Sequence, residues 1–303
     1  MNRCTRILCV GHAAQDLIYR VPAIPALPIK VLATDFSESG GGMAANAAVA
    51  IARLGGDAVY WGRVADDALG RRILADLETE GVDVRSARRV PGCRSSCTSI
   101  LVGDNGERLI CSFADPALDS NPDWLPVARI PWFDVVLADV RWPRGAARVL
   151  DEARAHHRPA LLDADVAAAD VLIDLSARAS HVLFSEAGLA VIGQGRSNGE
   201  ALRRARLDSH EVIGVTLGAE GFLWLEGGAE RHLSAPPIVP VDTLAAGDVW
   251  HGAFALALGE NNAVDVAARF AAAAAAIKCQ RHGGRSGAPI RSEVEKSLAV
   301  WRQ

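Results

Sequence analysis

The sequence predicts a doubly wound α/β fold, in which helices flank a largely parallel central sheet. Apolar strand-like runs alternate with segments of helical periodicity along most of the 303 residues, and this alternation is typical of βαβ units. Ala, Val, Leu and Gly abound while aromatic residues make up only 5% of the chain, a mixture that suits helices packed closely on parallel strands. The length suits one shared core, so we expect residues 1–303 to form a single domain.

The composition argues against several classes of function. Half of the residues are hydrophobic and the net charge is −4, which argues against disorder and, without a sizeable basic block, against a nucleic-acid partner. No apolar run reaches the ~18 uncharged residues that span a bilayer, so we expect no membrane segment. The N-terminus lacks the order of a secretion signal, and the six cysteines form no Cys-x-x-Cys motif. We therefore expect reduced thiols in a cytoplasmic protein.

The elements of the core follow from apolar runs and from helix-ending glycines such as Gly55 and Gly81. The predicted strands are Arg6–Gly11, Ala58–Gly62, Asp134–Ala138, Ala160–Asp163, His181–Phe184 and Val212–Thr216. The predicted helices are Ala44–Leu54, Ala68–Glu80, residues near 144–156, 186–192 and 199–206, Gly247–Leu258 and Val264–Cys279.

Two segments, about 17–39 and 96–113, break the alternation. The first is extended and interrupted by three prolines, which favour edge strands or irregular structure. The second alternates as a hairpin around Asp104-Asn105-Gly106, a strong turn signal. We expect the two segments to form a small sheet that projects from the core. Because such a sheet has no core of its own, it would act as a lid or as the surface of a homodimer.

The sharpest motif is the run Asp242-Thr243-Leu244-Ala245-Ala246-Gly247-Asp248, which leads into a predicted helix. Small residues at a helix start let backbone N–H groups converge on an anion, and the helix dipole favours negative charge there. Asp248 could take the proton of an attacking hydroxyl while the amides of Ala245, Ala246 and Gly247 hold a transferring phosphoryl group. The alternative is a carboxylate that only caps the helix. We expect His251, one turn further on, to lie behind Asp248.

A second glycine-rich run, Gly40–Asn46, also opens a helix. It fits G-x-G-x-x-A, which is compatible with a dinucleotide site. Such a fingerprint should follow the first core strand directly, whereas a proline-rich segment intervenes here. The run is also compatible with a tight turn that allows close helix packing, or with a site where a small polar ligand meets the backbone and Asn46. No G-x-x-x-x-G-K-[ST] occurs, which argues against a P-loop NTPase.

Taken together, these motifs resemble those of the ribokinase/phosphofructokinase-B family. Gly40–Gly56 looks like the first signature of that family and Asp242–Gly252 like the second, and Val215-Thr216-Leu217-Gly218 falls in the family's order. The resemblance covers nearly the whole chain. It implies a ribokinase-like fold, with a Rossmann-like central sheet and a β-sheet lid. It also implies ATP as phosphoryl donor, Mg²⁺ and, in many members, a monovalent cation such as K⁺.

The resemblance also implies roles for individual residues. The sugar would contact Asp16, Gly41, Gly42 and Asn46, and the monovalent cation would bind at Asp242. The residues expected around the nucleotide are Ser185, Glu186, Thr216, Gly218, Gly221, Gly283 and Gly284.

Within the family, the runs Val136–Trp142, Phe184–Leu189 and Lys278–Gly287 are similar to those of the sulfofructose kinases. That likeness implies a ketose-like sugar with an anionic group, held between Lys30 and Arg141. Arginine offers a planar fork to an oxyanion and lysine adds a point charge. The alternatives are a neutral-ketose or nucleoside kinase of the same fold, and a binding protein that has lost turnover.

Three departures from the family pattern stand out. Ala245 replaces the first glycine of Gly-Ala-Gly-Asp, and a Cβ there costs ~1–2 kcal/mol if the residue needs a positive φ. Ser112 stands where the sulfofructose kinases carry an asparagine that helps to hold the sulfonate, and its hydroxyl has a shorter reach. The Asn-x-x-Glu motif that many relatives use near Mg²⁺ is here Ser185-Glu186-Ala187-Gly188.

Overall fold

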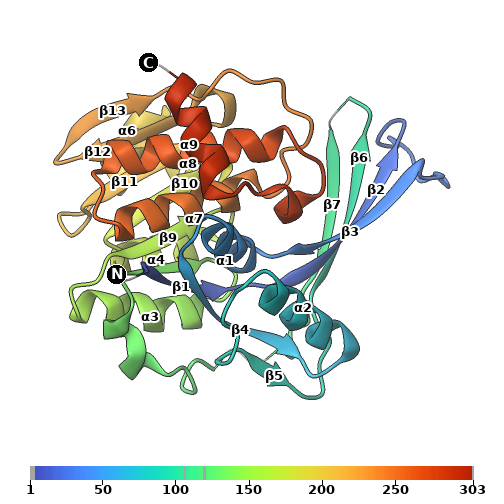
Figure 1. The fold of residues 1–303 in the computed structure, drawn as a ribbon, viewed down its shortest axis with the longest axis horizontal. Helices are drawn as coiled ribbons and strands as arrows, with labels where there is room; N and C mark the ends of the chain where they lie inside the picture. The colour runs from blue at the N-terminus through green and yellow to red at the C-terminus, as the bar shows by residue number, and fades with distance from the viewer. Residues whose placement is uncertain (1–3, 106, 119–120, 302–303) are drawn as a thin grey trace.

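The computed structural model describes residues 4–105, 107–118 and 121–301, and it contains a large sheet and a small one (Figure 1). Within these residues the large sheet has nine strands in the order β13-β12-β11-β10-β9-β8-β1-β4-β5. Neighbouring strands from β11 to β5 are parallel, whereas β12 and β13 are antiparallel. In chain order the strands are β1 (Arg6–Gly11), β4 (Asp57–Ala65), β5 (Arg88–Val90), β8 (Val135–Asp139), β9 (Ala160–Ala164), β10 (His181–Ser185), β11 (Val212–Thr216), β12 (Phe222–Glu226) and β13 (Ala229–Leu233).

Helices cover both faces of the large sheet, which confirms the predicted doubly wound α/β arrangement. Successive side chains of β1 face opposite layers, with Ile7 and Cys9 in one apolar cluster and Leu8 and Val10 in the other. The first layer contains α1 (Met43–Arg53), α2 (Ala68–Thr79), α7 (Ala246–Gly259), α8 (Val264–Cys279) and α9 (Arg291–Val300). The second contains α3 (Pro143–Ala155), α4 (Ala169–Arg178), α5 (Glu186–Gly193) and α6 (Asn198–Ala205).

The small sheet projects from one side of the molecule (Figure 1). Within the described residues it has four strands in the order β3-β2-β6-β7. They are β2 (Ala14–Val21), β3 (Asp35–Gly41), β6 (Cys97–Gly103) and β7 (Arg108–Phe113). The three prolines fall in the loop between β2 and β3 rather than in a strand, because proline cannot donate to a ladder. Gly106 of the predicted hairpin turn lies outside the described residues. That this sheet closes over a ligand stays a prediction.

The structure also contains elements that the sequence analysis did not predict. These are β5, α4, α9, the hairpin of β12 and β13, and the 3₁₀ helices η1 (Val127–Trp132), η2 (Gly218–Glu220) and η3 (Gly284–Gly287). All six cysteines are free. In the part of the chain that the structure describes, no helix is long and apolar enough to cross a membrane.

Candidate active site

The carboxyl ends of the parallel strands meet at one edge of the large sheet, where polar side chains gather. Asp139 ends β8, Ser185 ends β10 and Thr216 ends β11, while Asp163 is the residue before the end of β9. β1 ends at Gly11 and β2 starts only three residues later, so the small sheet begins at the same edge. In open α/β sheets this edge is where ligands bind.

A turn of three small residues, Ala245, Ala246 and Gly247, begins α7 at this edge; we call it the anion turn. Ala245 is the N-cap and has a left-handed backbone, with φ 62° and ψ 11°. Ala245 therefore has the positive φ that favours glycine, the residue that the family pattern carries at this position. The Ala246 N–H donates to the Thr243 carbonyl oxygen at 3.2 Å. The first N–H groups of a helix have no partner within it, so the start of α7 offers its remaining donors and the positive end of the helix dipole.

The Asp248 carboxylate lies in the first turn of α7 and is bound by Asn46 of α1. The Asn46 Nδ2 donates to Asp248 Oδ2 at 2.6 Å. The fold therefore brings together the glycine-rich run that opens α1 and the small-residue run that opens α7, although 202 residues separate Asn46 from Asp248. Burial raises the pKa of Asp248 to about 7, and the nearby Asp163 carboxylate adds to the rise, while the hydrogen bond from Asn46 opposes it. A carboxylate with such a pKa is suited to accept a proton near neutral pH.

His251 and Asp163 form a buried pair behind Asp248. The His251 Nδ1 lies 3.5 Å from Asp163 Oδ2 and 2.8 Å from the Gly247 carbonyl oxygen. Burial, followed by the negative charges of Asp165 and Asp139, raises the pKa of Asp163 well above its ordinary value. His251 was expected behind Asp248, and the structure buries it against Asp163 and Gly247. Asp163 ends a predicted strand, but its pairing with α7 could not be predicted, because nothing in its local sequence indicates which helix packs on it.

Polar side chains of the small sheet form a row that crosses all four strands. Asp16 of β2 pairs in register with Ser39 of β3 and Thr98 of β6, and Thr98 pairs with Ser112 of β7. The hydroxyls of Thr98 and Ser112 lie 3.3 Å apart. Burial raises the pKa of Asp16 to about 6, against the opposing effects of the Thr98 hydroxyl and the Arg285 guanidinium. A Cβ at Gly41 would collide with the Asp16 carboxylate, so this glycine is required by close packing.

The buried Asp139 carboxylate holds the start of α1 in place. Its Oδ2 accepts hydrogen bonds from the N–H groups of His12 at 2.8 Å and Ala44 at 3.0 Å. Gly42, the N-cap of α1, has φ +92°, and a Cβ there would collide with the His12 backbone. These contacts fix where Asn46 points. Asp139 was not predicted as a site residue; it follows the predicted strand Asp134–Ala138, and its two N–H partners lie far from it in the sequence.

Lys30 and Arg141, the two side chains predicted to hold an anionic group of the sugar, lie in different surroundings. The Arg141 guanidinium lies 3.2 Å from Asp165 Oδ2 and donates to the Val166 carbonyl oxygen at 2.9 Å. The Ser185 hydroxyl donates to the other oxygen of Asp165 at 2.7 Å. Lys30 is exposed in the loop between β2 and β3 and, within the described residues, has no hydrogen bond or ion pair. The structure thus places Arg141 and Ser185 in one cluster, and Lys30 shares no partner with them.

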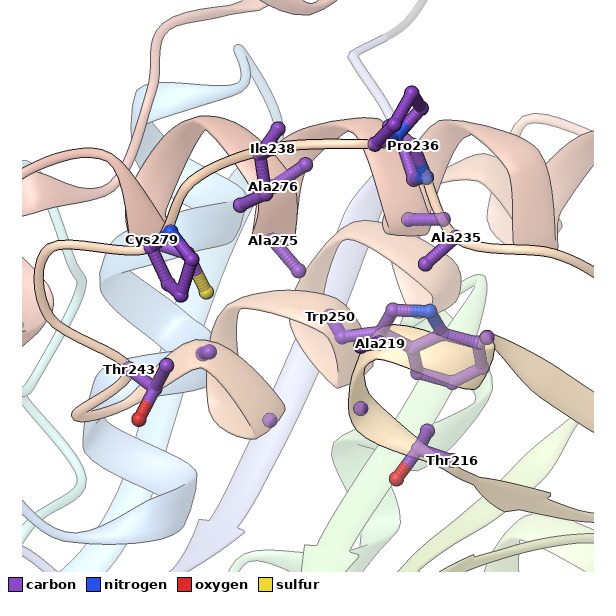
Figure 2. A pocket seen from close by; sticks show the side chains of 17 residues that line it. Thr216, Ala219, Ala235, Pro236, Ile238, Thr243, Trp250, Ala275, Ala276 and Cys279 are labelled. Carbon is purple, nitrogen blue, oxygen red and sulfur yellow. The ribbon is translucent and has the colours of Figure 1, made fainter. Parts of the chain in front are cut away.

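A pocket of about 440 Å³ lies between α7, α8 and the chain that follows β13 (Figure 2); we call it the α7–α8 pocket. Thr216, Gly218 and Gly221, which the sequence analysis assigned to the nucleotide, line this pocket, and it reaches Ala246 and Gly247 of the anion turn. The remaining lining residues were not predicted: Ala219, Ala235, Pro236, Pro237, Ile238, Pro240, Thr243, Trp250, Ala272, Ala275, Ala276 and Cys279. Figure 2 shows the Trp250 indole beside Ala219, below the proline-containing segment. A wide, mostly apolar slot of this kind suits a flat heterocycle.

Four residues predicted at the nucleotide do not line this pocket. The N–H groups of Gly283 and Gly284 instead donate to Asp242 Oδ2, at 3.0 and 3.4 Å. Ser185 caps α5 by accepting from the Gly188 N–H, and Glu186 lies on the exposed surface after β10. Whether these four residues contact the nucleotide stays a prediction.

This arrangement can support phosphoryl transfer. The α7–α8 pocket reaches one side of the anion turn, and the Asn46–Asp248 pair stands in the first turn of the same helix. A phosphoryl donor and a hydroxyl acceptor would therefore meet at the backbone donors of that turn, with a carboxylate ready to take the proton.

Fold and site together define a phosphotransferase of the α/β class. The family model for pfkB family carbohydrate kinases matches residues 4–291, and the chain belongs to that family. It is 30% identical to the ribokinase of Bacillus subtilis over 301 residues, with 97% of this chain and all of that one covered. A fructokinase of Vibrio alginolyticus is 27% identical over 282 residues, covering 84% and 90% of the two chains.

Among solved structures, a candidate ribokinase from Agrobacterium tumefaciens is similar at 39% identity and a TM-score of 0.95, with 99% of this chain and all of that one covered. The fold is ribokinase-like, as the sequence predicted, and the protein is an ATP-dependent carbohydrate kinase.

Proposed function

We propose that the sugar phosphorylated by this kinase is a ketose that carries an anionic group, with 6-deoxy-6-sulfofructose as the model substrate. The observation that carries the proposal is the Arg141 side chain, which lies just beyond β8 and keeps 43% of its surface exposed. Asp165 and the Val166 carbonyl engage only part of its guanidinium. Because a guanidinium has five N–H donors in a fixed plane, it can accept a second oxyanion such as a sulfonate.

The remaining parts of the site receive roles that fit this substrate. Lys30 has no ion-pair partner among the described residues and would meet the anion from the loop of the small sheet, while the exposed Ser112 hydroxyl could donate to it. We propose that Asp16, Asn46 and the backbone at Gly41 and Gly42 bind the sugar hydroxyls.

At the reacting end, Asp248 is the proposed base and the anion turn the proposed phosphoryl site. The adenine would lie in the α7–α8 pocket, which Thr216, Gly218 and Gly221 line. Glu186, exposed after β10, is the proposed carboxylate for Mg²⁺, which would supply positive charge to offset that of the phosphates.

A neutral ketose is the second candidate, and one observation favours it. The Asp165 carboxylate already offsets the charge of Arg141 at 3.2 Å, so a substrate anion would have to share the guanidinium with a negative charge. A fructose-like sugar would need no such sharing.

The test compares kcat/KM for 6-deoxy-6-sulfofructose, fructose and ribose, measured as ADP release. In the wild type we expect the sulfonated sugar to be preferred. In Arg141→Met, and further in the double variant with Lys30→Met, kcat/KM for that sugar should fall ~10–100-fold, which corresponds to the ~1.5–3 kcal/mol of a hydrogen bond to a charged group. The loss should lie mainly in KM, because a clamp holds substrate and transition state alike.

Arg148→Met is the matched control, since Arg148 is an exposed arginine of α3 that also pairs with a carboxylate, Glu152. Arg148→Met should leave kcat/KM unchanged for both the sulfonated sugar and fructose. If the wild type prefers fructose and neither Arg141→Met nor Lys30→Met alters that preference, the anionic substrate is refuted and the neutral one replaces it.

We also propose that the kinase is a cytoplasmic homodimer joined through its small sheets. The free cysteines fit a reducing compartment. Large apolar side chains of edge strands are exposed there, among them Phe36 of β3 and Leu109 and Ile110 of β7, and a second copy would cover them. Sedimentation should give twice the chain mass, and Ile110→Glu should give the monomer. A wild-type monomer at micromolar concentration would contradict the dimer.

A further inference from the structure

The buried ammonium of Lys278 occupies a position beside the anion turn where the family resemblance suggested a monovalent cation. Lys278 lies in the last turn of α8 and is completely buried. Its Nζ donates to the Asp242 carbonyl oxygen at 2.8 Å and to the Arg281 carbonyl oxygen at 3.5 Å, and it lies 3.4 Å from Asp242 Oδ2. The ammonium group carries three N–H donors, and two carbonyl oxygens and one carboxylate oxygen surround it.

The Asp242 carboxylate links this ammonium to the anion turn. Its Oδ1 accepts from the Leu244 N–H at 2.8 Å, directly before Ala245. Its Oδ2 accepts from Gly283 and Gly284, and the Ser39 hydroxyl of the small sheet donates to the Gly283 carbonyl at 2.9 Å. Asp242 therefore connects the ammonium to the anion turn through Leu244, and to strand β3 through Gly283 and Ser39.

Asp242 and Lys278 form an ionised pair. Burial alone would raise the pKa of Asp242, but the hydrogen bond from Leu244 and the charge of Lys278 outweigh it and keep that pKa below its ordinary value. Burial lowers the pKa of Lys278, and the Asp242 charge opposes this effect. Removing either partner would leave an uncompensated charge in the interior.

A monovalent metal ion does not fit these residues as they stand. The oxygens of Asp242 that would bind it already hold a cation, and a second positive charge at contact distance from the ammonium would be repelled. We propose that Lys278 is a built-in cation, which holds Asp242 and the anion turn in the phosphate-binding shape and makes this kinase independent of K⁺. The inference rests on the proposed phosphate-binding role of the anion turn.

The first test needs no variant. The wild-type rate of ADP release should differ by less than about twofold between buffers that contain KCl, NaCl or choline chloride at equal ionic strength. Its melting temperature should also be the same in the three salts, because an ion that binds only the native state would raise it. A tenfold or greater activation by K⁺ over choline overturns the proposal while leaving the kinase function intact.

The second test removes the ammonium. In choline buffer, Lys278→Met should raise the Kd for ADP, measured by calorimetry, about tenfold or more. In Lys278→Ala, which opens space for an ion, KCl should lower that Kd and raise the melting temperature, since K⁺ can then take the place of the ammonium. Lys296→Met, in the exposed lysine of α9, is the control and should behave as the wild type. An unchanged Kd in folded Lys278→Met contradicts the proposal, and if that variant does not fold, the wild-type salt series decides.

Discussion

Replacing Ala245 by glycine should relieve a strain that the structure locates in a single residue. Ala245 caps α7 with φ 62° and ψ 11°, and a Cβ in this left-handed region costs about 1–2 kcal/mol. Glycine removes that cost but adds about 0.4–1 kcal/mol of chain entropy to the unfolded state. The net gain in the free energy of unfolding is therefore between about 0 and 1.5 kcal/mol, which raises the melting temperature by up to a few degrees.

The neighbouring residue provides the matched control. Ala246 is the first residue of α7 and is absent from the positive-φ residues of the described chain, so Ala246→Gly adds entropy to the unfolded state without relieving strain. It should lower the free energy of unfolding by about 0.5–1 kcal/mol. Differential scanning calorimetry of the two ligand-free variants gives the comparison, and kcat with ATP in excess gives the functional effect. For Ala245→Gly we expect kcat equal to or above that of the wild type.

Two outcomes would refute this reasoning. If Ala245→Gly destabilises the protein as much as Ala246→Gly does, the left-handed alanine stores no strain. If Ala245→Gly folds normally but loses most of its kcat, the alanine is an adaptation that stiffens the anion turn for phosphate.

Two further predictions concern the base and the pocket. Because Asp248 must be ionised to accept a proton and its pKa is raised to about 7, kcat/KM should fall about tenfold per pH unit below pH 7. A limb that broke at about pH 4, the ordinary range of an aspartate, would contradict the raised pKa of Asp248. Ala275→Phe places a ring in the α7–α8 pocket and should raise the KM for ATP at least tenfold with little change for the sugar. Val266→Phe, on an exposed part of α8, is its control, and equal KM values for ATP would place the nucleotide elsewhere.

The parts of the site that could be predicted from sequence are those carried by local motifs. The run from Asp242 to Asp248 contains a helix start, small residues and a carboxylate, and these imply an anion site at that helix without knowledge of the rest of the fold. The parallel core was predictable for a similar reason, since strands such as β8 are buried at every residue and read as continuous apolar runs.

Residues whose role depends on distant partners could not be predicted. Trp250 and Ala275 line the pocket only because α7 and α8 pack against the chain after β13, which their positions in two predicted helices do not indicate. Lys278 was noted only as part of the run Lys278–Gly287, whereas the fold buries it against Asp242, 36 residues away. Gly283 and Gly284 were assigned to the nucleotide, but their N–H groups bind that same carboxylate.

The most direct test of the proposed chemistry is kcat of Asp248→Asn. Asparagine keeps an oxygen that can accept the 2.6 Å hydrogen bond from Asn46 but cannot take the substrate proton. We expect an unchanged melting temperature, a Kd for ADP within a few-fold of the wild type, and a kcat lower by ~10²–10⁴. Asp265→Asn, an exposed carboxylate in the first turn of α8, should retain full activity. An Asp248→Asn variant with near wild-type kcat would show that Asp248 is not the base.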